Sequence, residues 1–441
     1  MHSPVTSSKV TTAQVFAIAG PAMVANLTTP LIGIVSTMAI GRLGDATLLG
    51  GVAIASVLFD CLFWLFAFLR MSTVAFTAQS LGAGETTELR VILVRGFIVA
   101  AVVGLALILL QTPLSTIVLG LMGGSEGVTN AAKTYFTIRI WSAPMALGNY
   151  VVLGWLIGQA RARLALGTQI TINLINAAAT ALLVLVLDLG IAGAAIAAVI
   201  AETAGLLLGI LIAGRLTHWQ LAIDFTTLFD REKLMRMLSV NRDIMLRTAS
   251  LIAVWLFFSA QGARAGDTAL AANAVLNNFL LISAFFLDGL ANAAEQLCGR
   301  ALGARDKDGF ADAVRLVMIW GFCFSLAVAG TFALSGPALI ELMTASADVR
   351  HLAREFLPFV IFAPLLGVFA FGFDGVYIGA TWARDMRNLM MLSLVIFLIA
   401  WFALRSFGNA GLWGALLVHY AARGGLEALR YPALLRASFK A

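Results

Sequence analysis

Long apolar runs dominate the chain, and each is close to the length needed to cross a lipid bilayer. A spanning helix needs about 20 mostly apolar residues, and about twelve such runs follow one another with short loops between them. They lie at residues 13–40, 49–69, 93–112, 133–158, 165–187, 191–213, 244–264, 273–302, 312–334, 352–380, 388–406 and 411–434. Charged residues make up only 12% of the 441 residues, whereas a soluble domain has about 25%. We therefore expect an all-α polytopic membrane protein with twelve transmembrane helices.

Short motifs recur in the two halves of the chain in the same order. The tripeptide Leu-Gly-Ala at 81–83 returns at 302–304, 221 positions later. Further matches with almost the same shift are Ala143-Pro144 with Ala363-Pro364, Ile157-Gly158 with Ile378-Gly379, and Ala162-Arg163 with Ala383-Arg384. The pattern predicts two six-helix lobes, 1–225 and 226–441. Because six is even, the lobes would be related by a pseudo-two-fold axis along the membrane normal, a geometry that suits rocking alternating access.

Lysine and arginine are distributed unevenly between the two sides of the predicted bundle. The side that carries the N-terminus holds about 21 of them, and the opposite side about 7, so the positive-inside rule places both termini in the cytoplasm. We expect a multi-pass protein of the inner (plasma) membrane. The stretch from Asp230 to Leu238 alternates charged residues with Leu and Met, which predicts a surface helix in the headgroup region.

Other classes of function find no support in the sequence. The basic residues are scattered, so nucleic acid is not an expected partner. The cysteines and histidines show no metal-ligand spacing, which argues against a metal site. An enzyme would need a catalytic His or a paired-carboxylate loop outside the apolar runs, and none is visible. The expected partners are a small-molecule substrate and the lipid bilayer, and the chain is expected to act as a monomer.

A polar stripe runs through the apolar segment 273–305. Asp288, Asn292 and Glu295 recur at steps of four and three, which places them on one face of a helix. Carboxylates facing lipid would cost a few kcal/mol each, so this stripe should face a cavity or another helix. For Glu295, an ion pair with Arg300 or Arg305 is the structural alternative to a role in transport.

Further ionisable groups lie deep in other apolar runs. They are Asp60, Glu202, Asp374 and, near a helix end, Arg247. Because burial disfavours the charged form of a carboxyl group, such an acid can alternate between a proton, a sodium ion and a cationic substrate. Alternatively, Glu202 bonds to neighbouring backbone, and Arg247 reaches toward the headgroups or serves as a structural ion-pair partner.

Aromatic residues accompany two of these acids. Asp288 and Asp374 each lie between an aromatic-rich stretch and a glycine, which allows a backbone or a substrate to approach closely. Phe285, Phe371 and Tyr377 could hold flat, lipophilic cations by stacking and cation–π attraction. Ordinary packing of these rings is the alternative.

Several segments resemble a known family of transporters. FLRMSTVAFTAQSLGAG at 68–84, FLDGLANAAEQLCGRALGARD at 286–306 and FDGVYIGATWARDMRN at 373–388 resemble the multidrug and toxic compound extrusion (MATE) family, and most of all its DNA-damage-inducible F branch. The resemblance implies antiport, in which protons or sodium ions enter as drugs or metabolites leave. It implies no cofactor besides the coupling ion.

One position departs from the family pattern. Members of this branch often carry an aspartate in the first helix, in a context such as G-x-V-D-T, where this chain has Ser36. Serine does not titrate in this range, so Asp374 and Asp288 become the expected coupling residues, with Asp60, Glu202 and Glu295 as further candidates. Ser36 and Asn292 join the aromatic residues as candidates for the substrate cavity.

The sequence thus predicts an antiporter that exports lipophilic, often cationic compounds. The alternative is a flippase or an exporter of a lipid-linked or anionic metabolite on a related fold. That alternative requires cationic side chains inside the membrane, and Arg247 is the chief one that the apolar runs offer.

Overall fold

The computed structural model describes residues 9–41, 46–122, 125–219 and 224–440. The side chains at 29–37, 46 and 121–122 lie outside the description, and with them the predicted cavity residue Ser36. The described residues are almost wholly helical. By their internal contacts they divide into two compact units. Unit 1 comprises Met1–Met23, Gly82–Gly84 and Leu238–Ala441, and unit 2 comprises Val24–Leu81 and Glu85–Met237.

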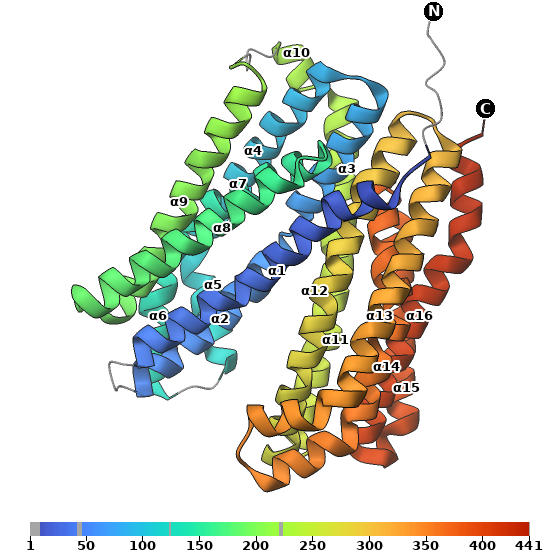
Figure 1. Cartoon of the computed structure of the whole chain (residues 1–441). Coiled ribbons are helices and arrows are strands. Elements are labelled where there is room, and N and C mark those ends of the chain that lie inside the picture. Colours follow the sequence, from blue (N-terminus) through green and yellow to red (C-terminus); the bar gives the residue numbers. More distant parts are fainter. Residues whose placement is uncertain (1–8, 42–45, 123–124, 220–223, 441) are drawn as a thin grey trace, which may run out of the picture. The chain divides into compact units, whose positions relative to one another are not determined.

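Unit 2 contains most of the first half of the chain. Its helices are α1 (Thr12–Gly41, which begins in unit 1), α2 (Ala46–Leu65), α3 (Phe68–Ala83), α4 (Thr86–Leu109), α5 (Gln111–Met122), α6 (Glu126–Arg139), α7 (Ala143–Gly158), α8 (Ala162–Thr180), α9 (Gly190–Leu216) and α10 (Phe225–Leu228) (Figure 1). Within the unit α4 packs on α7, α2 on α6, and α8 on α9. A 3₁₀ turn at Ile140–Ser142 separates α6 from α7, and Pro144 lies in the first turn of α7, where a missing N–H costs little.

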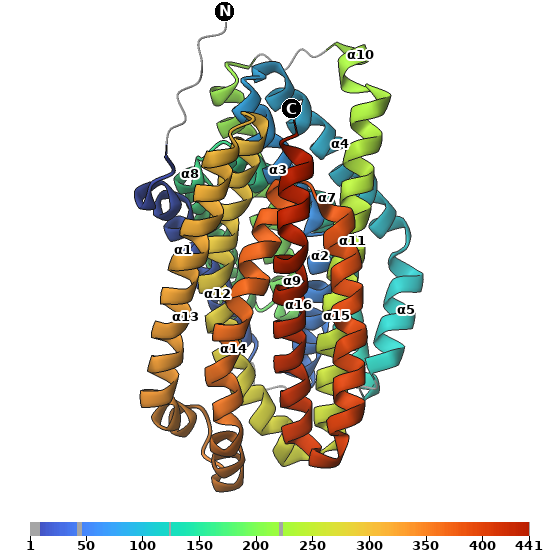
Figure 2. The ribbon, with the colours of Figure 1, turned by 90° about the vertical axis from the view of Figure 1, so that its right-hand side faces the viewer.

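Unit 1 contains the long helices of the second half. They are α11 (Arg231–Arg264, which begins in unit 2), α12 (Asp267–Gly303), α13 (Lys307–Met343), α14 (Ala347–Gly379), α15 (Ala383–Leu404) and α16 (Gly408–Ser438) (Figure 2). Helix α14 is central, because it packs against α12, α13 and α16. The starts of α13 and α14 carry side-chain caps, since Asp306 accepts from Gly309 N at 2.9 Å and Ser346 accepts from Val349 N at 3.4 Å.

The helices are long and apolar enough for a membrane protein. Within the described residues, 10 helical ranges have the length and hydropathy of membrane spans. Some of these ranges join neighbouring helices, as Ala383–Ser438 joins α15 and α16. The chain is therefore a multi-pass membrane protein, while the count of twelve spans remains a prediction.

One local expectation was wrong. The predicted surface helix from Asp230 to Leu238 is instead the first part of α11, which continues without a break to Arg264. Pro364 lies inside the continuous helix α14 and does not interrupt it. A proline within a membrane helix removes one backbone hydrogen bond, and packed neighbouring helices tolerate this loss.

The internal repeat is visible in the way helices approach one another. In unit 2 a Cβ on Gly154 of α7 would lie 2.5 Å from the backbone oxygen of Arg70 on α3. In unit 1 a Cβ on Gly375 of α14 would lie 2.4 Å from the backbone oxygen of Ala291 on α12. Both residues of the second pair follow those of the first by 221 positions, which is the shift of the sequence repeat. Glycine at these positions allows close helix packing at equivalent places in both halves.

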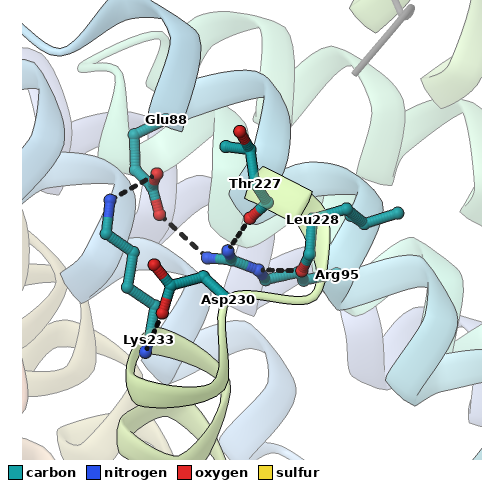
Figure 3. A network of polar contacts seen from close by, with 6 residues as sticks. All are labelled: Glu88, Arg95, Thr227, Leu228, Asp230 and Lys233. Carbon is teal, nitrogen blue, oxygen red and sulfur yellow. Dashed lines mark hydrogen bonds and ion pairs between the residues drawn. The ribbon is translucent and has the colours of Figure 1, made fainter. Parts of the chain in front are cut away.

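A buried arginine ties the connection between the two halves to unit 2 (Figure 3). The side chain of Arg95 on α4 donates to the carbonyl oxygens of Thr227 and Leu228, the second at 2.8 Å. It also pairs with Glu88 at 2.9 Å, and Lys233 of α11 reaches the other oxygen of Glu88 at 2.8 Å. The segment around α10 is thereby held against α4.

Replacement of Arg95 should loosen this segment. We expect Arg95→Gln to lower the free energy of unfolding by about 1–3 kcal/mol, because two partly buried carbonyl oxygens and Glu88 lose a charged hydrogen-bond donor. The measurements are thermal unfolding in detergent and limited proteolysis around residues 224–230. The matched control is Arg231→Gln, since Arg231 is exposed at the start of α11. Equal stability and equal cleavage in the two variants would show that the contacts of Arg95 do not hold the segment.

Candidate functional site

The predicted coupling residue Asp374 lies between two arginines in unit 1. It belongs to α14, and one of its carboxylate oxygens, Oδ2, pairs with Arg247 of α11 and with Arg423 of α16. All three residues are buried. Two adjacent guanidinium groups favour the ionised form of a carboxyl group. Asp374 is therefore held as the shared counter-ion of both arginines.

A second acid, Glu427, lies one helical turn after Arg423 on α16. It is 0% exposed, and neither of its carboxylate oxygens has a hydrogen-bond partner within the described residues. Arg423 and Arg247 are the charges that act on it. The hydroxyl group of Tyr377 donates to the backbone oxygen of Glu427 at 2.8 Å, which joins α14 to α16 at this level.

The acids of the polar stripe on α12 act electrostatically on these arginines, Asp288 on both and Glu295 on Arg247. Asn292 and Glu295 are buried, whereas Asp288 is exposed. Both Asp288 and Glu295 interact electrostatically with Arg247. The stripe thus adds negative charge to the site around Asp374.

The aromatic candidates of unit 1 contact groups of the protein itself. The guanidinium of Arg423 lies 5.4 Å from the ring centroid of Phe371. Tyr377 is fully buried and forms an edge contact with Trp382, with centroids 5.4 Å apart. Phe285 on α12 is partly buried. A role of these rings in substrate binding remains a prediction.

Unit 2 holds a separate site of acids around an arginine. Glu202 on α9 accepts a hydrogen bond of 2.6 Å from the side-chain amide of Asn149 on α7, and that amide also donates to the backbone oxygen of Glu202. Asp60 on α2 is exposed. Both acids interact electrostatically with Arg139 of α6, whose guanidinium lies 4.7 Å from the ring centroid of Phe59. Each unit therefore combines intramembrane acids with arginine.

The glycines that follow Asp288 and Asp374 serve helix packing. A Cβ on Gly289 would lie 2.4 Å from the Met23 side chain of α1, and a Cβ on Gly375 would meet the backbone of α12. The close approach that the sequence predicts at these glycines is thus made by neighbouring helices.

Four residues of the two sites were missed by the sequence reasoning. They are Arg139, Asn149, Arg423 and Glu427. A signal for three of them was present, because Arg139 lies in the apolar run 133–158, and Arg423 and Glu427 lie four residues apart in the run 411–434. That spacing places the last two on one helix face. In the part of the chain that the structure describes, no group of three or more His, Cys, Asp and Glu residues could hold a metal ion.

Carboxyl groups outnumber guanidinium groups at the site in unit 1, whereas in unit 2 Arg70 joins Arg139, Asp60 and Glu202 among the charges that act on Tyr150, and the two signs are equal in number. In unit 1 the acids around Arg247 and Arg423 are Asp288, Glu295, Asp374 and Glu427. In unit 2 the acids around Arg139 are Asp60 and Glu202. Because uncompensated charge is costly in a low-dielectric interior, the site in unit 1 can accept a proton or another cation.

Comparison with known proteins identifies the family. The MatE family model matches residues 21–182 and 232–402. The chain is 37% identical to DNA damage-inducible protein F of Escherichia coli (strain K12) over 405 residues, covering 92% of this chain and 88% of the relative. It is 25% identical to Protein DETOXIFICATION 43 of Arabidopsis thaliana over 332 residues, 74% of this chain and 62% of that protein.

Solved structures agree in fold. An outward-facing multidrug resistance MATE family transporter of the MOP superfamily superposes with a TM-score of 0.87 at 18% identity, covering 97% of this chain and 96% of that one. A MOP superfamily transporter from Pyrococcus furiosus, described as having a binding pocket of reverse polarity, superposes with a TM-score of 0.86 at 17% identity, with the same coverage. The chain therefore belongs to the MATE family of multidrug-type membrane transporters, whose members are not enzymes.

Proposed function

We propose that this transporter is a cation-coupled antiporter that exports lipophilic, often cationic compounds. The observation that carries the proposal is the excess of carboxyl over guanidinium groups in unit 1. A buried site with excess negative charge is stabilised by a proton, a sodium ion or a cationic substrate. Antiport follows when the coupling ion and the substrate in turn compensate the excess negative charge of this site.

The acids have different proposed roles, which follow from their surroundings. Asp288 and Asp374 are the proposed centre of the site in unit 1. Asp374 forms ion pairs with Arg247 and Arg423. Asp288 is exposed and would bind an incoming cation. Asp60 and Glu202 would assist in unit 2. Phe285, Phe371, Tyr377, Asn292 and Ser36 remain candidates for the substrate cavity.

The transport cycle that we propose is rocking of two six-helix lobes with twelve spans in total. The duplicated glycine contacts support this, because they give both halves the same internal packing. The protein would act as a monomer in the inner (plasma) membrane with both termini in the cytoplasm, as the distribution of Lys and Arg suggests.

Transport by the purified protein in liposomes tests the proposal. A lipophilic dye cation such as ethidium is loaded, and a proton or sodium gradient is imposed across the membrane. We expect the gradient to drive dye transport, because ion entry is exchanged for dye exit. Dye movement that is indifferent to both gradients would exclude coupled antiport.

A second candidate function is export of an anionic or lipid-linked metabolite. It gains support from Arg139 and Arg423, which add to Arg247, the chief cation that the sequence predicts inside the membrane. The distinguishing measurement is lipid scrambling in the same liposomes with a fluorescent anionic lipid. Scrambling without gradient-driven dye transport would favour this candidate.

A further inference from the structure

The acids of unit 1 differ in how well their negative charges are compensated. Asp374 pairs with both Arg247 and Arg423 through one oxygen, so protonation of Asp374 would break two ion pairs at once. Glu427 is equally deep, yet neither of its oxygens accepts a hydrogen bond within the described residues. A buried carboxylate without hydrogen bonds is costly, and its neutral form is much less so.

Arg247 and Arg423 nevertheless have N–H donors that are available to form hydrogen bonds with Glu427. The Nε groups of Arg247 and Arg423 are buried and have no hydrogen-bond partner among the described residues. Arg423 precedes Glu427 by four residues on α16, a spacing at which side chains meet on a helix face. The Nε donors of the two arginines and the carboxylate oxygens of Glu427 thus lie in one cluster without hydrogen bonds. The cluster can therefore adopt a second arrangement, in which these donors bond to Glu427.

We propose that Glu427 is the acid of unit 1 that takes up and releases the coupling proton, while Asp374 stays ionised as the fixed counter-ion of Arg247 and Arg423. The inference rests on the proposed function, and it identifies the group that binds the coupling proton in unit 1. When the proton leaves a Glu427 oxygen, the carboxylate accepts hydrogen bonds from the arginines, and the four groups balance in charge. When a proton binds, Glu427 becomes a neutral acid and the arginines return to Asp374 alone.

The other charged groups around Glu427 fit this assignment. Arg423 of α16 and Arg247 of α11 act on Glu427 directly. Asp288 and Glu295 of α12 act on Arg247, and Asp374 of α14 pairs with both arginines. Asp385 of α15 and Arg430 of α16 act on Tyr377 of α14 and pair with each other at 2.8 Å. A sodium ion at Glu427 would be the third cation beside two guanidinium groups, and like charges at short range repel. A proton instead produces a neutral carboxylic acid.

Tyr377 positions this acid. Its hydroxyl group binds the Glu427 backbone, and a Cβ on Gly424 would lie 2.8 Å from the backbone nitrogen of Ala370 on α14. Helices α14 and α16 are therefore in close contact where Glu427 lies. A change in the hydrogen bonds of Glu427 can thus alter the packing of α16 on α14.

The test separates coupling from transport in full-length protein reconstituted in liposomes. Wild type, Glu427→Gln and Glu341→Gln are compared for ethidium transport driven by a proton gradient and for exchange of labelled against unlabelled ethidium without a gradient. Glu341 is the control because it is an exposed acid of α13 that pairs with Arg354. We expect Glu427→Gln to keep gradient-free exchange and to lose gradient-driven transport, while Glu341→Gln keeps both.

Proton release in detergent provides a second readout. Addition of ethidium to wild type should release protons, and addition to Glu427→Gln should release none. Glu427→Asp, which keeps a carboxyl group, should restore both release and gradient-driven transport in part. Full gradient-driven transport or undiminished proton release in Glu427→Gln would overturn the assignment, as would wild-type transport driven by sodium alone. Transport driven by sodium alone would still agree with the proposed antiport. If neither gradient changed transport by the wild type, the proposed function itself would be contradicted.

Discussion

Replacement of Asp374 by Asn is expected to destabilise the protein strongly. The change removes the carboxylate that forms ion pairs with both Arg247 and Arg423, and breaking a buried pair in this way costs about 3–5 kcal/mol. Thermal or chemical unfolding of the detergent-solubilised protein measures the loss. The effect should appear in the absence of substrate and of any ion gradient, because it arises from the ion pairs of Asp374 and not from transport.

A matched control is available on the neighbouring helix. Asp385 of α15 pairs with Arg430 at 2.8 Å, but the side chains are 30% and 49% exposed. An exposed pair contributes about 0–1 kcal/mol, so Asp385→Asn should change stability little. If the two Asp→Asn variants were equally stable, Asp374 would not be the counter-ion that its position between two arginines indicates.

Replacement of Gly375 by Ala is the second change with a large expected effect. The added Cβ would lie 2.4 Å from the backbone oxygen of Ala291, and backbone cannot rotate away as a side chain can. Overpacking of this kind costs about 1–3 kcal/mol. Because α12 carries Asp288 and Glu295, we also expect slower gradient-driven transport. Unfolding midpoints and ethidium transport in liposomes measure the two effects.

Gly425 supplies the control for this prediction. It lies on α16, and a Cβ there would meet nothing within 4 Å. Gly425→Ala should therefore keep wild-type transport and should be at least as stable, since alanine favours a helix over glycine. A Gly375→Ala variant as stable as Gly425→Ala would mean that α12 and α14 do not pack as closely as described.

The membrane class and several site residues could be predicted from the sequence for simple reasons. The length and spacing of the apolar runs follow directly from the thickness of a bilayer. Asp374 and Glu295 could be found because an acid inside such a run is conspicuous. The steps of three and four that join Asp288 to Glu295 also predicted correctly that they share one helix, α12.

The partners of these residues could not be predicted, because periodicity describes one helix at a time. Nothing in the sequence near Asp374 indicates that Arg247, 127 positions earlier, and Arg423, 49 positions later, lie beside it. The predicted surface helix failed for a related reason. A pattern of alternating charged and apolar residues fits both a helix in the headgroup region and the end of a spanning helix. Lys233 pairs with Glu88, which lies 145 positions earlier in the chain, and the sequence pattern does not indicate this contact.

Proton release on substrate binding tests the central claim most directly. Purified wild-type protein in weakly buffered detergent is titrated with ethidium at several sodium concentrations, and released protons are followed with a pH-sensitive dye. If the excess acids of unit 1 hold a cation that the substrate replaces, binding should release protons, or should weaken as sodium rises. Ethidium binding that releases no protons and is independent of sodium would contradict the account.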